Sequence, residues 1–320
     1  MALARLLALN GHSVRLWCRE EDHPDALRAR RENPALLPGV LLPDSVEVSR
    51  DGDPDANIAV LAVPSHAMRS VASAFSFSPQ TMRVSVAKGI ENDSLLRMSE
   101  VIAEVSGPVP VVALSGPSHA EEVGRDLPAS VVVAGTVADV CEQAQRAFMC
   151  PTFRVYSSHD LVGVELGGSL KNVIAIAAGA CDGLELGDNA KAALITRGLA
   201  EITRLGVALG ADPLTFAGLS GMGDLIVTCC SRHSRNRAVG ARLARGETLE
   251  KITGSSPMVA EGVRTTQSAR QLALRHDVSM PITEQVHKIL FEGSAPRESI
   301  AALMQRDPKP ETSVPPGLCS

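Results

Sequence analysis

The stretch ALARLLALNGHSVRLWCRE, residues 2–20, contains a helical pattern followed at once by an extended one. Its leucines and alanines recur at helical spacing up to Gly11, a residue type that commonly ends a helix. Val14, Leu16 and Cys18 then occupy alternate positions, as in a strand. Because a helix leading into a strand is the second half of a βαβ unit, the stretch predicts a dinucleotide-type α/β sheet.

The strand and loop expected before this helix are not found in the sequence. The usual fingerprint is a strand, then G-x-G-x-x-G, then a helix, and no G-x-G-x-x-G occurs in the 320 residues. Either the strand and loop lie upstream of Met1, or the chain lacks a pyrophosphate cradle. We expect the first, because loss of a central strand would leave the hydrogen bonds of its neighbours unpaired.

Two periodicities divide the chain. Short β-branched runs alternate with helical stretches up to about residue 156, whereas helices separated by Gly-rich turns follow residue 160. We therefore predict a Rossmann-like parallel-sheet domain over residues 1–160, with its first strand missing, and an all-helical domain over residues 161–305. The polar, Pro-rich residues 306–320 predict a disordered tail.

Composition excludes several classes of protein. The chain is 45% hydrophobic and 21% charged, as in soluble globular proteins, and its net charge of −5 argues against a dedicated nucleic-acid binder. The seven cysteines have no metal-ligand spacing, and no export signal or membrane-length apolar run occurs. We expect a cytoplasmic protein without a metal site or membrane insertion. A homodimer is compatible with this architecture.

Two lysines stand out. Lys88 follows the predicted strand of residues 83–87, and ligands of parallel sheets bind outside the carboxyl ends of the strands. Lys171 is the one charged residue in the apolar helix of residues 168–180. On the residues alone, a solvated strand-end lysine and a snorkelling lysine explain the pair as well as a catalytic site does. In a catalytic site, their ammonium groups would stabilise charge on a substrate oxygen.

Three turns carry polar groups suited to ligands. SGPSHAEE, residues 115–122, predicts a helix start with free N–H groups, where His119 is assigned a capping or surface role. Asp224 follows the flexible GLSGMG and is by itself a common helix cap. The basic SRHSRNR, residues 231–237, fits a solvated helix start. It also brings together a hydroxyl, a guanidinium and helix N-terminal amides, which suit a phosphate.

Seven segments, in order and with matching spacing, resemble the bacterial NAD(P)-dependent glycerol-3-phosphate dehydrogenase family. The resemblance runs from residue 2 to about residue 300, and its block over residues 169–201 is long and highly specific. The family's usual opening, a strand and a Gly-rich loop that makes the main pyrophosphate contacts, is not found in this sequence. The segments are LALNGHSVRLWCRE, VSVAKGIE, ALSGPSHAEEV, GSLKNVIAIAAGACDGLELGDNAKAALITRGLAEITRLG, FAGLSGMGDLIVTC, HSRNRAVG and VAEGVRTT.

The resemblance implies a role for each matching residue. Lys171 matches the family's proton-transferring lysine and is the expected catalytic residue. The implied substrate-binding residues are Lys88, Gly116, Ser118, Lys171, Asp224, Ser234, Arg235 and Asn236. The implied cofactor-binding residues are Arg19, Lys88, Ala120, Arg235, Val259 and Glu261.

The expected activity is reduction of dihydroxyacetone phosphate to sn-glycerol 3-phosphate for phospholipid synthesis, with NADP or NAD. Arg19 at the ribose position favours NADP, because an arginine there suits a 2′-phosphate. One alternative is a ketopantoate or β-hydroxyacid reductase, which would act on carboxylates. The other is a non-catalytic binding module that has lost its cofactor loop. The Ser234–Arg235–Asn236 cluster favours a phosphorylated substrate over the first.

Overall fold

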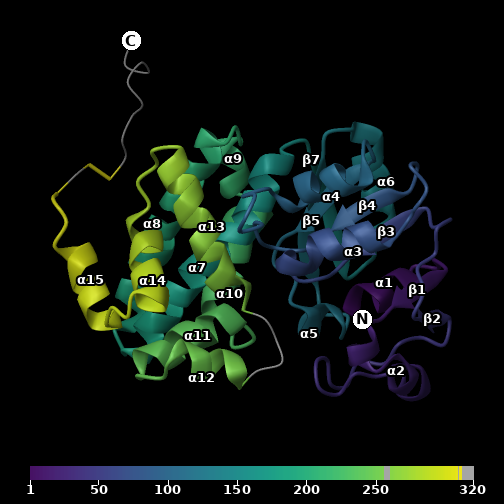
Figure 1. The fold of residues 1–320 in the computed structure, drawn as a ribbon, viewed down its shortest axis with the longest axis horizontal. Helices are drawn as coiled ribbons and strands as arrows, with labels where there is room; N and C mark the ends of the chain where they lie inside the picture. The colour runs from purple at the N-terminus through teal and green to yellow at the C-terminus, as the bar shows by residue number, and fades with distance from the viewer. Residues whose placement is uncertain (256–259, 309, 312–320) are drawn as a thin grey trace, which may run out of the picture.

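The structure, a computed structural model, describes residues 1–255, 260–308 and 310–311. Figure 1 shows two parts side by side, one built on strands and one built of helices. The change falls between β7 (Phe153–Ser158) and α7 (Leu161–Gly183). The predicted α/β class with a following helical part is confirmed. Of the predicted tail, residues 309 and 312–320 lie outside the described residues.

The strands form two sheets. The smaller one pairs β1 (Val14–Trp17) with β2 (Val46–Ser49) in parallel. The larger one has the order β3-β4-β5-β6-β7, and β3, β4 and β5 run parallel to one another. Its first four strands are β3 (Ile58–Leu61), β4 (Met82–Ser85), β5 (Val111–Ser115) and β6 (Ala129–Gly135).

Two strands depart from the predicted all-parallel sheet, because β6 and β7 both run opposite to β3, β4 and β5. β6 runs antiparallel to β5, and β7 then runs parallel to β6. The segment between β5 and β6 contains only the four-residue α5 (Ala120–Val123). Because so short a helix does not form a crossover over a sheet face, β6 returns beside β5 in the opposite direction.

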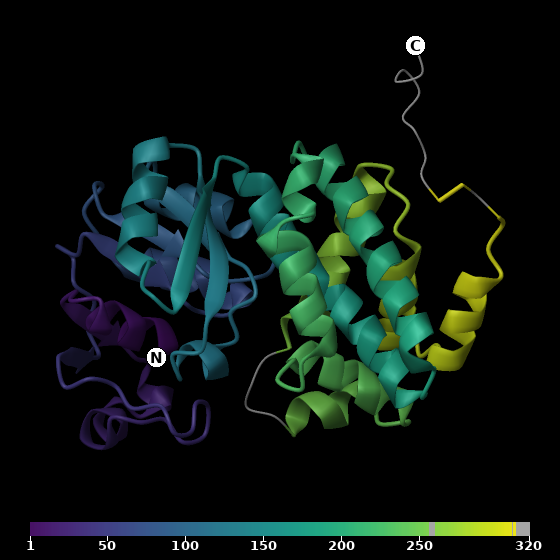
Figure 2. The ribbon, with the colours of Figure 1, turned by 180° about the vertical axis from the view of Figure 1, so that it is seen from behind.

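Helices cover both faces of the larger sheet (Figures 1 and 2). On one face, α1 (Ala2–Leu9) and α6 (Ala138–Phe148) share a core with β4, β5 and β6. On the other, α3 (Met68–Ala74) and α4 (Met98–Ser106) form a second core with β3. The short α2 (Pro24–Arg30) packs on β2, and the 3-10 turns η1 (Glu20–Asp22) and η2 (Ser65–Ala67) follow β1 and β3.

The helical part is organised around α7. Most of α7 is buried, since its apolar residues face neighbours on all sides. Its packing partners include α8 (Gly187–Ala208), α10 (Asp224–Cys230), α11 (Arg235–Ala244) and α13 (Glu261–Arg275). The remaining elements are α9 (Pro213–Phe216), the helical turn η3 (Leu219–Gly223), α12 (Leu249–Gly254), α14 (Pro281–Phe291) and α15 (Pro296–Met304).

Within the described part of the chain, two segments are long and apolar enough to cross a membrane by length and composition alone. They are α7, whose most apolar window is 83% buried within the protein, and Pro213–Cys230, whose window is 39% buried. The second is divided among α9, η3 and α10. The burial of α7 is that of a core helix packed by other helices.

Two glycines allow α7 and α11 to cross at backbone contact. A Cβ on Gly179 would lie 1.9 Å from the carbonyl oxygen of Arg237. A Cβ on Gly240 would lie 1.9 Å from the carbonyl oxygen of Ile176. Both obstacles are helix backbone, which cannot give way as a flexible side chain can. The crossing brings the start of α11 against the middle of α7.

Gly240→Ala is therefore expected to destabilise the protein by about 2 kcal/mol or more, as overpacking of a tight core does. Urea unfolding would measure the change. Gly254→Ala in α12 is the matched control, because a Cβ there would meet no atom of the described residues within 4 Å. We expect the control to be neutral or slightly stabilising. Equal unfolding free energies for the two variants would contradict the close crossing.

Candidate active site

The site lies where the larger sheet meets the helical part. Lys88 follows β4, and Gly116 follows β5, so the carboxyl ends of two parallel strands contribute to it. Lys171 reaches it from α7, which packs closely against β5. A Cβ on Gly168 of α7 would lie 2.5 Å from the Ser115 hydroxyl oxygen, so the two elements approach closely here.

Asp224, at the start of α10, joins the two lysines. Lys88 Nζ lies 2.7 Å from Asp224 Oδ2, and Lys171 Nζ contacts Asp224 Oδ1. Lys88 Nζ also donates to the carbonyl oxygen of Gly116 at 2.9 Å. Lys171 and Asp224 are buried, whereas 22% of the Lys88 side chain is exposed. The structure thus brings together four residues predicted from distant parts of the sequence.

This burial changes the acidity of both partners. Desolvation lowers the pKa of Lys171 to about 7; Asp224 opposes that shift and the charge of Lys88 adds to it. Burial by itself would raise the pKa of Asp224, but the charges of Lys171 and Lys88 outweigh it and hold that pKa below its usual value. Lys171 can therefore give and take a proton near neutral pH, while Asp224 stays ionised.

Two polar partners of this site were missed in the sequence. Thr228 Oγ1 accepts a hydrogen bond from Lys171 Nζ at 2.7 Å and donates to the Asp224 carbonyl oxygen at 2.6 Å. Asn172 Nδ2 donates to the Lys88 carbonyl oxygen at 3.0 Å. The available signals were the i,i+4 spacing from Asp224 to Thr228 and the position of Asn172 beside Lys171.

The three residues of the predicted phosphate cluster differ in their surroundings. Ser234 is buried and caps α11, accepting from the Arg237 N–H at 3.2 Å. Asn236 is also buried, and its amide donates to Asn172 Oδ1 at 2.9 Å and accepts from the Gly262 N–H at 2.9 Å. Arg235 is exposed at the first position of α11. A ligand at this helix start would thus meet Arg235 before the other two.

The turn after β5 contributes further groups. Ser118 Oγ donates to the carbonyl oxygen of Gly116 at 3.1 Å, and Ala120 is exposed at the start of α5. His119 is half-buried, with its ring centre 6.1 Å from that of His233. Burial lowers the pKa of His119, and the charge of Lys171 lowers it further. The turn therefore faces both lysines and the loop before α11.

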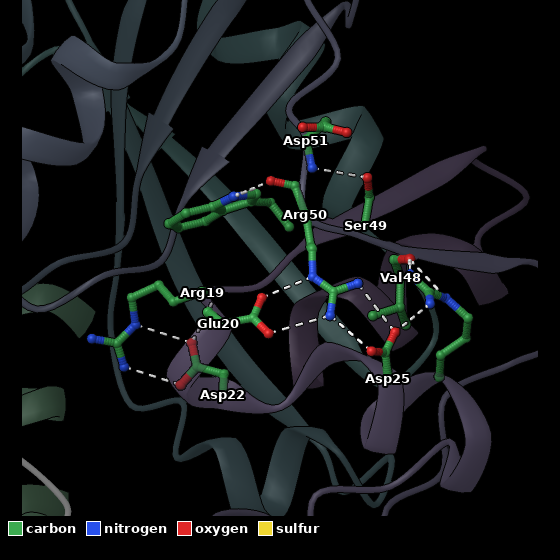
Figure 3. A network of polar contacts seen from close by, with 10 residues as sticks. Arg19, Glu20, Asp22, Asp25, Val48, Ser49, Arg50 and Asp51 are labelled. Carbon is green, nitrogen blue, oxygen red and sulfur yellow. Dashed lines mark hydrogen bonds and ion pairs between the residues drawn. The ribbon is translucent and has the colours of Figure 1, made fainter.

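The predicted cofactor residues are more widely spread. Glu261, at the start of α13, accepts from the Ser65 N–H at 3.0 Å and from Ser65 Oγ at 2.5 Å. This contact joins the helical part to the turn after β3. Arg19 follows β1 and is paired with Asp22 (Figure 3). Val259 lies outside the described residues.

The residues at the sheet edge fit a bound dinucleotide and substrate in two respects. Ser115 Oγ and His119 Nε2 are buried and have no hydrogen-bond partner among the residues that the structure describes. Such atoms are satisfied when a polar ligand binds. Gly116 has a φ of 141°, and a Cβ there would lie 2.9 Å from the Val131 Cα, so the turn requires glycine.

Comparison with known proteins matches both halves of the chain to the same family. Residues 1–141 match the family described as the N-terminus of NAD-dependent glycerol-3-phosphate dehydrogenase, and residues 160–301 match its C-terminus. A relative from Pelotomaculum thermopropionicum, named glycerol-3-phosphate dehydrogenase [NAD(P)+], is 53% identical over 313 residues, covering 95% of this chain and 90% of that protein.

Solved structures agree. The glycerol-3-phosphate dehydrogenase of Coxiella burnetii superimposes with a TM-score of 0.90 at 38% identity, and the match covers 95% of each chain. A putative ketopantoate reductase from Ralstonia solanacearum superimposes with a TM-score of 0.53 at 14% identity over 94% of each chain. The second likeness concerns the fold alone.

Asp224→Asn is expected to destabilise the protein by about 3–5 kcal/mol, because it removes the only carboxylate that contacts the two ammonium groups among the described residues. Chemical denaturation would measure the loss. Asp126→Asn is the matched control, since its carboxylate pairs with Arg5 at the surface and is 48% exposed. Its loss should stay below about 1 kcal/mol. A similar small loss for Asp224→Asn would contradict a buried, coupled triad.

Proposed function

Because the chain belongs to the NAD-dependent glycerol-3-phosphate dehydrogenase family, we propose that it interconverts dihydroxyacetone phosphate and sn-glycerol 3-phosphate with NAD or NADP. The observation that carries this proposal is the buried contact of Lys171 with Asp224, beside Lys88. Reduction of the ketone would be its main direction and would supply the glycerol backbone of phospholipids.

Lys171 is the proton donor in this proposal. The chemistry supplied by the bound nicotinamide is transfer of a hydride to the carbonyl carbon, C2. Negative charge then develops on the carbonyl oxygen, and the Lys171 ammonium neutralises it and transfers its proton to that oxygen. The reverse reaction requires the neutral amine to accept the proton of the substrate hydroxyl. A lysine whose pKa lies at about 7 can serve in both directions.

The neighbours of Lys171 position it. Asp224 and Thr228 each accept a hydrogen bond from the Lys171 ammonium. These two bonds fix the direction of its third N–H. Lys88 keeps an exposed fraction of 22% and remains accessible to substrate oxygens and to the cofactor. Gly116 and Ser118 complete the substrate side of the β5 turn.

The phosphate of the substrate binds at the start of α11. Arg235 supplies an exposed guanidinium, while Ser234 and Asn236 supply a hydroxyl and an amide beside free helix N–H groups. Arg237 does not belong to this set, since its Nε pairs with Asp182 at 2.5 Å. This cluster supports a phosphorylated ketone over the carboxylate of a ketopantoate-type reductase.

The cofactor binds along the carboxyl edge of the sheets. In this proposal Arg19 would hold the adenosine ribose, Glu261 would lie against the nicotinamide, and Lys88, Ala120 and Arg235 would contact the cofactor. The homodimer and the cytoplasmic location remain predictions from the sequence.

Lys171→Ala tests the proposal directly. The variant should lose about 10²–10⁴-fold in kcat for dihydroxyacetone phosphate reduction, because its proton donor is gone, with a much smaller change in substrate affinity. Steady-state kinetics and calorimetric titration of the substrate would separate the two effects. Lys251→Ala, on the exposed face of α12, should behave as the parent enzyme. Near-parental turnover in Lys171→Ala would refute the assignment.

The pH dependence follows from the same residue. Because the pKa of Lys171 lies at about 7, its ammonium is present below that pH and lost above it. The kcat for ketone reduction should fall as the pH rises through about 7, whereas the kcat for glycerol 3-phosphate oxidation should rise. Asp224→Asn should move both inflections to lower pH, since Asp224 stabilises the charged lysine. Inflections that stay in place would mean that another group titrates.

A further inference from the structure

The carboxyl end of β1 carries groups of opposite charge where the adenosine ribose of a dinucleotide lies in this type of sheet. A carboxylate at that position accepts a hydrogen bond from the 2′-hydroxyl of NAD, while an arginine accommodates the 2′-phosphate of NADP. The sequence places Arg19 there and follows it with three acids. Which of them controls the ribose depends on how the side chains pair.

The structure pairs Arg19 with its own turn (Figure 3). Arg19 Nε lies 3.0 Å from Asp22 Oδ2, and Nη2 lies 3.0 Å from Asp22 Oδ1, so the guanidinium is held in a two-point fork. The third nitrogen, Nη1, lies 3.2 Å from Glu21 Oε2. The Arg19 N–H also donates to Asp22 Oδ2 at 3.2 Å. Asp22 is therefore anchored by both the backbone and the side chain of Arg19.

A second arginine is neutralised in the same way. Arg50 follows β2, and its Nε lies 2.8 Å from Glu20 Oε2 while its Nη2 lies 2.7 Å from Asp25 Oδ2. Asp25 also accepts from Arg28 Nη1 at 2.7 Å. Figure 3 shows the pairs of Arg50 with Glu20 and Asp25 beside the Arg19 fork. Four carboxylates thus meet three guanidinium groups at this edge, which leaves no excess of positive charge for a phosphate.

We propose that Asp22 makes the turn after β1 select NAD over NADP. A 2′-phosphate would have to displace Asp22 from Arg19 and would then stand beside the carboxylates of Asp22 and Glu21. A 2′-hydroxyl instead donates to a carboxylate that is already held in place. The proposal rests on the proposed function, because it takes this edge as the dinucleotide site. The sequence alone, in which the Asp22 contact is not visible, predicts from Arg19 a preference for NADP. The pairing with Asp22 reverses that prediction.

The Arg19–Asp22 pair lies at the surface of the protein, where a ligand can reach it, and is not part of the core. The side chains of Arg19 and Asp22 are 56% and 31% exposed. Exposed ion pairs of this kind contribute about 1 kcal/mol or less to the stability of a fold. Replacing Asp22 should therefore change ligand choice while the fold is retained.

Binding of two adenosine fragments to the full chain tests the proposal. Calorimetric titration with 5′-AMP and 2′,5′-ADP isolates the 2′-phosphate, since the two probes differ only there. The parent chain should bind 5′-AMP more tightly. Asp22→Asn should bind 2′,5′-ADP about tenfold more tightly than the parent does, which corresponds to the release of one competing charge. Adding Arg19→Ala to that variant should remove the gain.

Asp25→Asn is the matched control, because it removes one negative charge from the same edge and leaves the Arg19 fork intact. It should change the ratio of the two affinities less than twofold. If Asp25→Asn bound 2′,5′-ADP as much more tightly as Asp22→Asn does, the net charge of this edge would explain the effect. That result would overturn the assignment to Asp22. Tighter binding of 2′,5′-ADP than of 5′-AMP by the parent chain, or no binding of either probe, would also overturn it.

A parallel assay keeps the two proposals distinguishable. Oxidation of glycerol 3-phosphate is followed with NAD and with NADP on the same protein. Turnover with equal kcat/KM for both cofactors would reject the selective turn and leave the proposed function standing. Selective binding of 5′-AMP without turnover of glycerol 3-phosphate would reject the proposed function and keep the turn.

Discussion

The Asp224 carboxylate, held between two ammonium groups, is the interaction on which the site depends. Lys171 sits within a buried, apolar helix, where an isolated charge would be expensive. Asp224 offsets part of that cost, whereas the positive charge of Lys88 works against the charged form of Lys171 and helps to keep Asp224 ionised. The same contact joins the sheet to the helices, because Lys88 follows β4 and the other two residues lie on α7 and α10. The same two ammonium groups and carboxylate therefore contribute both to the stability of the fold and to the proposed proton transfer.

Close backbone packing makes this contact possible. Gly168 admits β5 and its Ser115 against α7, and Gly179 and Gly240 bring α11 against the same helix. A single methyl group on Gly179 or Gly240 would push α11 away from α7, because both glycines face helix backbone. The start of α11, with Ser234 and Arg235, would then move away from Lys171. Small residues on α7 thus determine how far the proposed phosphate position lies from the proton donor.

A chain of amides extends the contact across the helical part. Asn172 donates to the backbone of Lys88, Asn236 donates to Asn172, and the N–H of Gly262 donates to Asn236. Glu261, the neighbour of Gly262, is bonded to Ser65 after β3. Because buried amides must be paired, each member restricts the next. The strand ends, α7, α11 and α13 are consequently held in one arrangement around the site.

The sequence by itself determined the order of strands and helices and the change from an α/β part to a helical part near residue 160. It also singled out Lys88, Lys171 and Asp224 as candidate site residues. The order of elements follows from local periodicity, whereas the three residues were singled out by the resemblance to the family. Only the tertiary structure decided the reversed direction of β6, the contacts of Thr228 and Asn172 with the lysines, and the partner of Arg19. A pattern along the chain records which residues are apolar or charged. Strand direction and charge pairing depend on distances between residues that only packing sets.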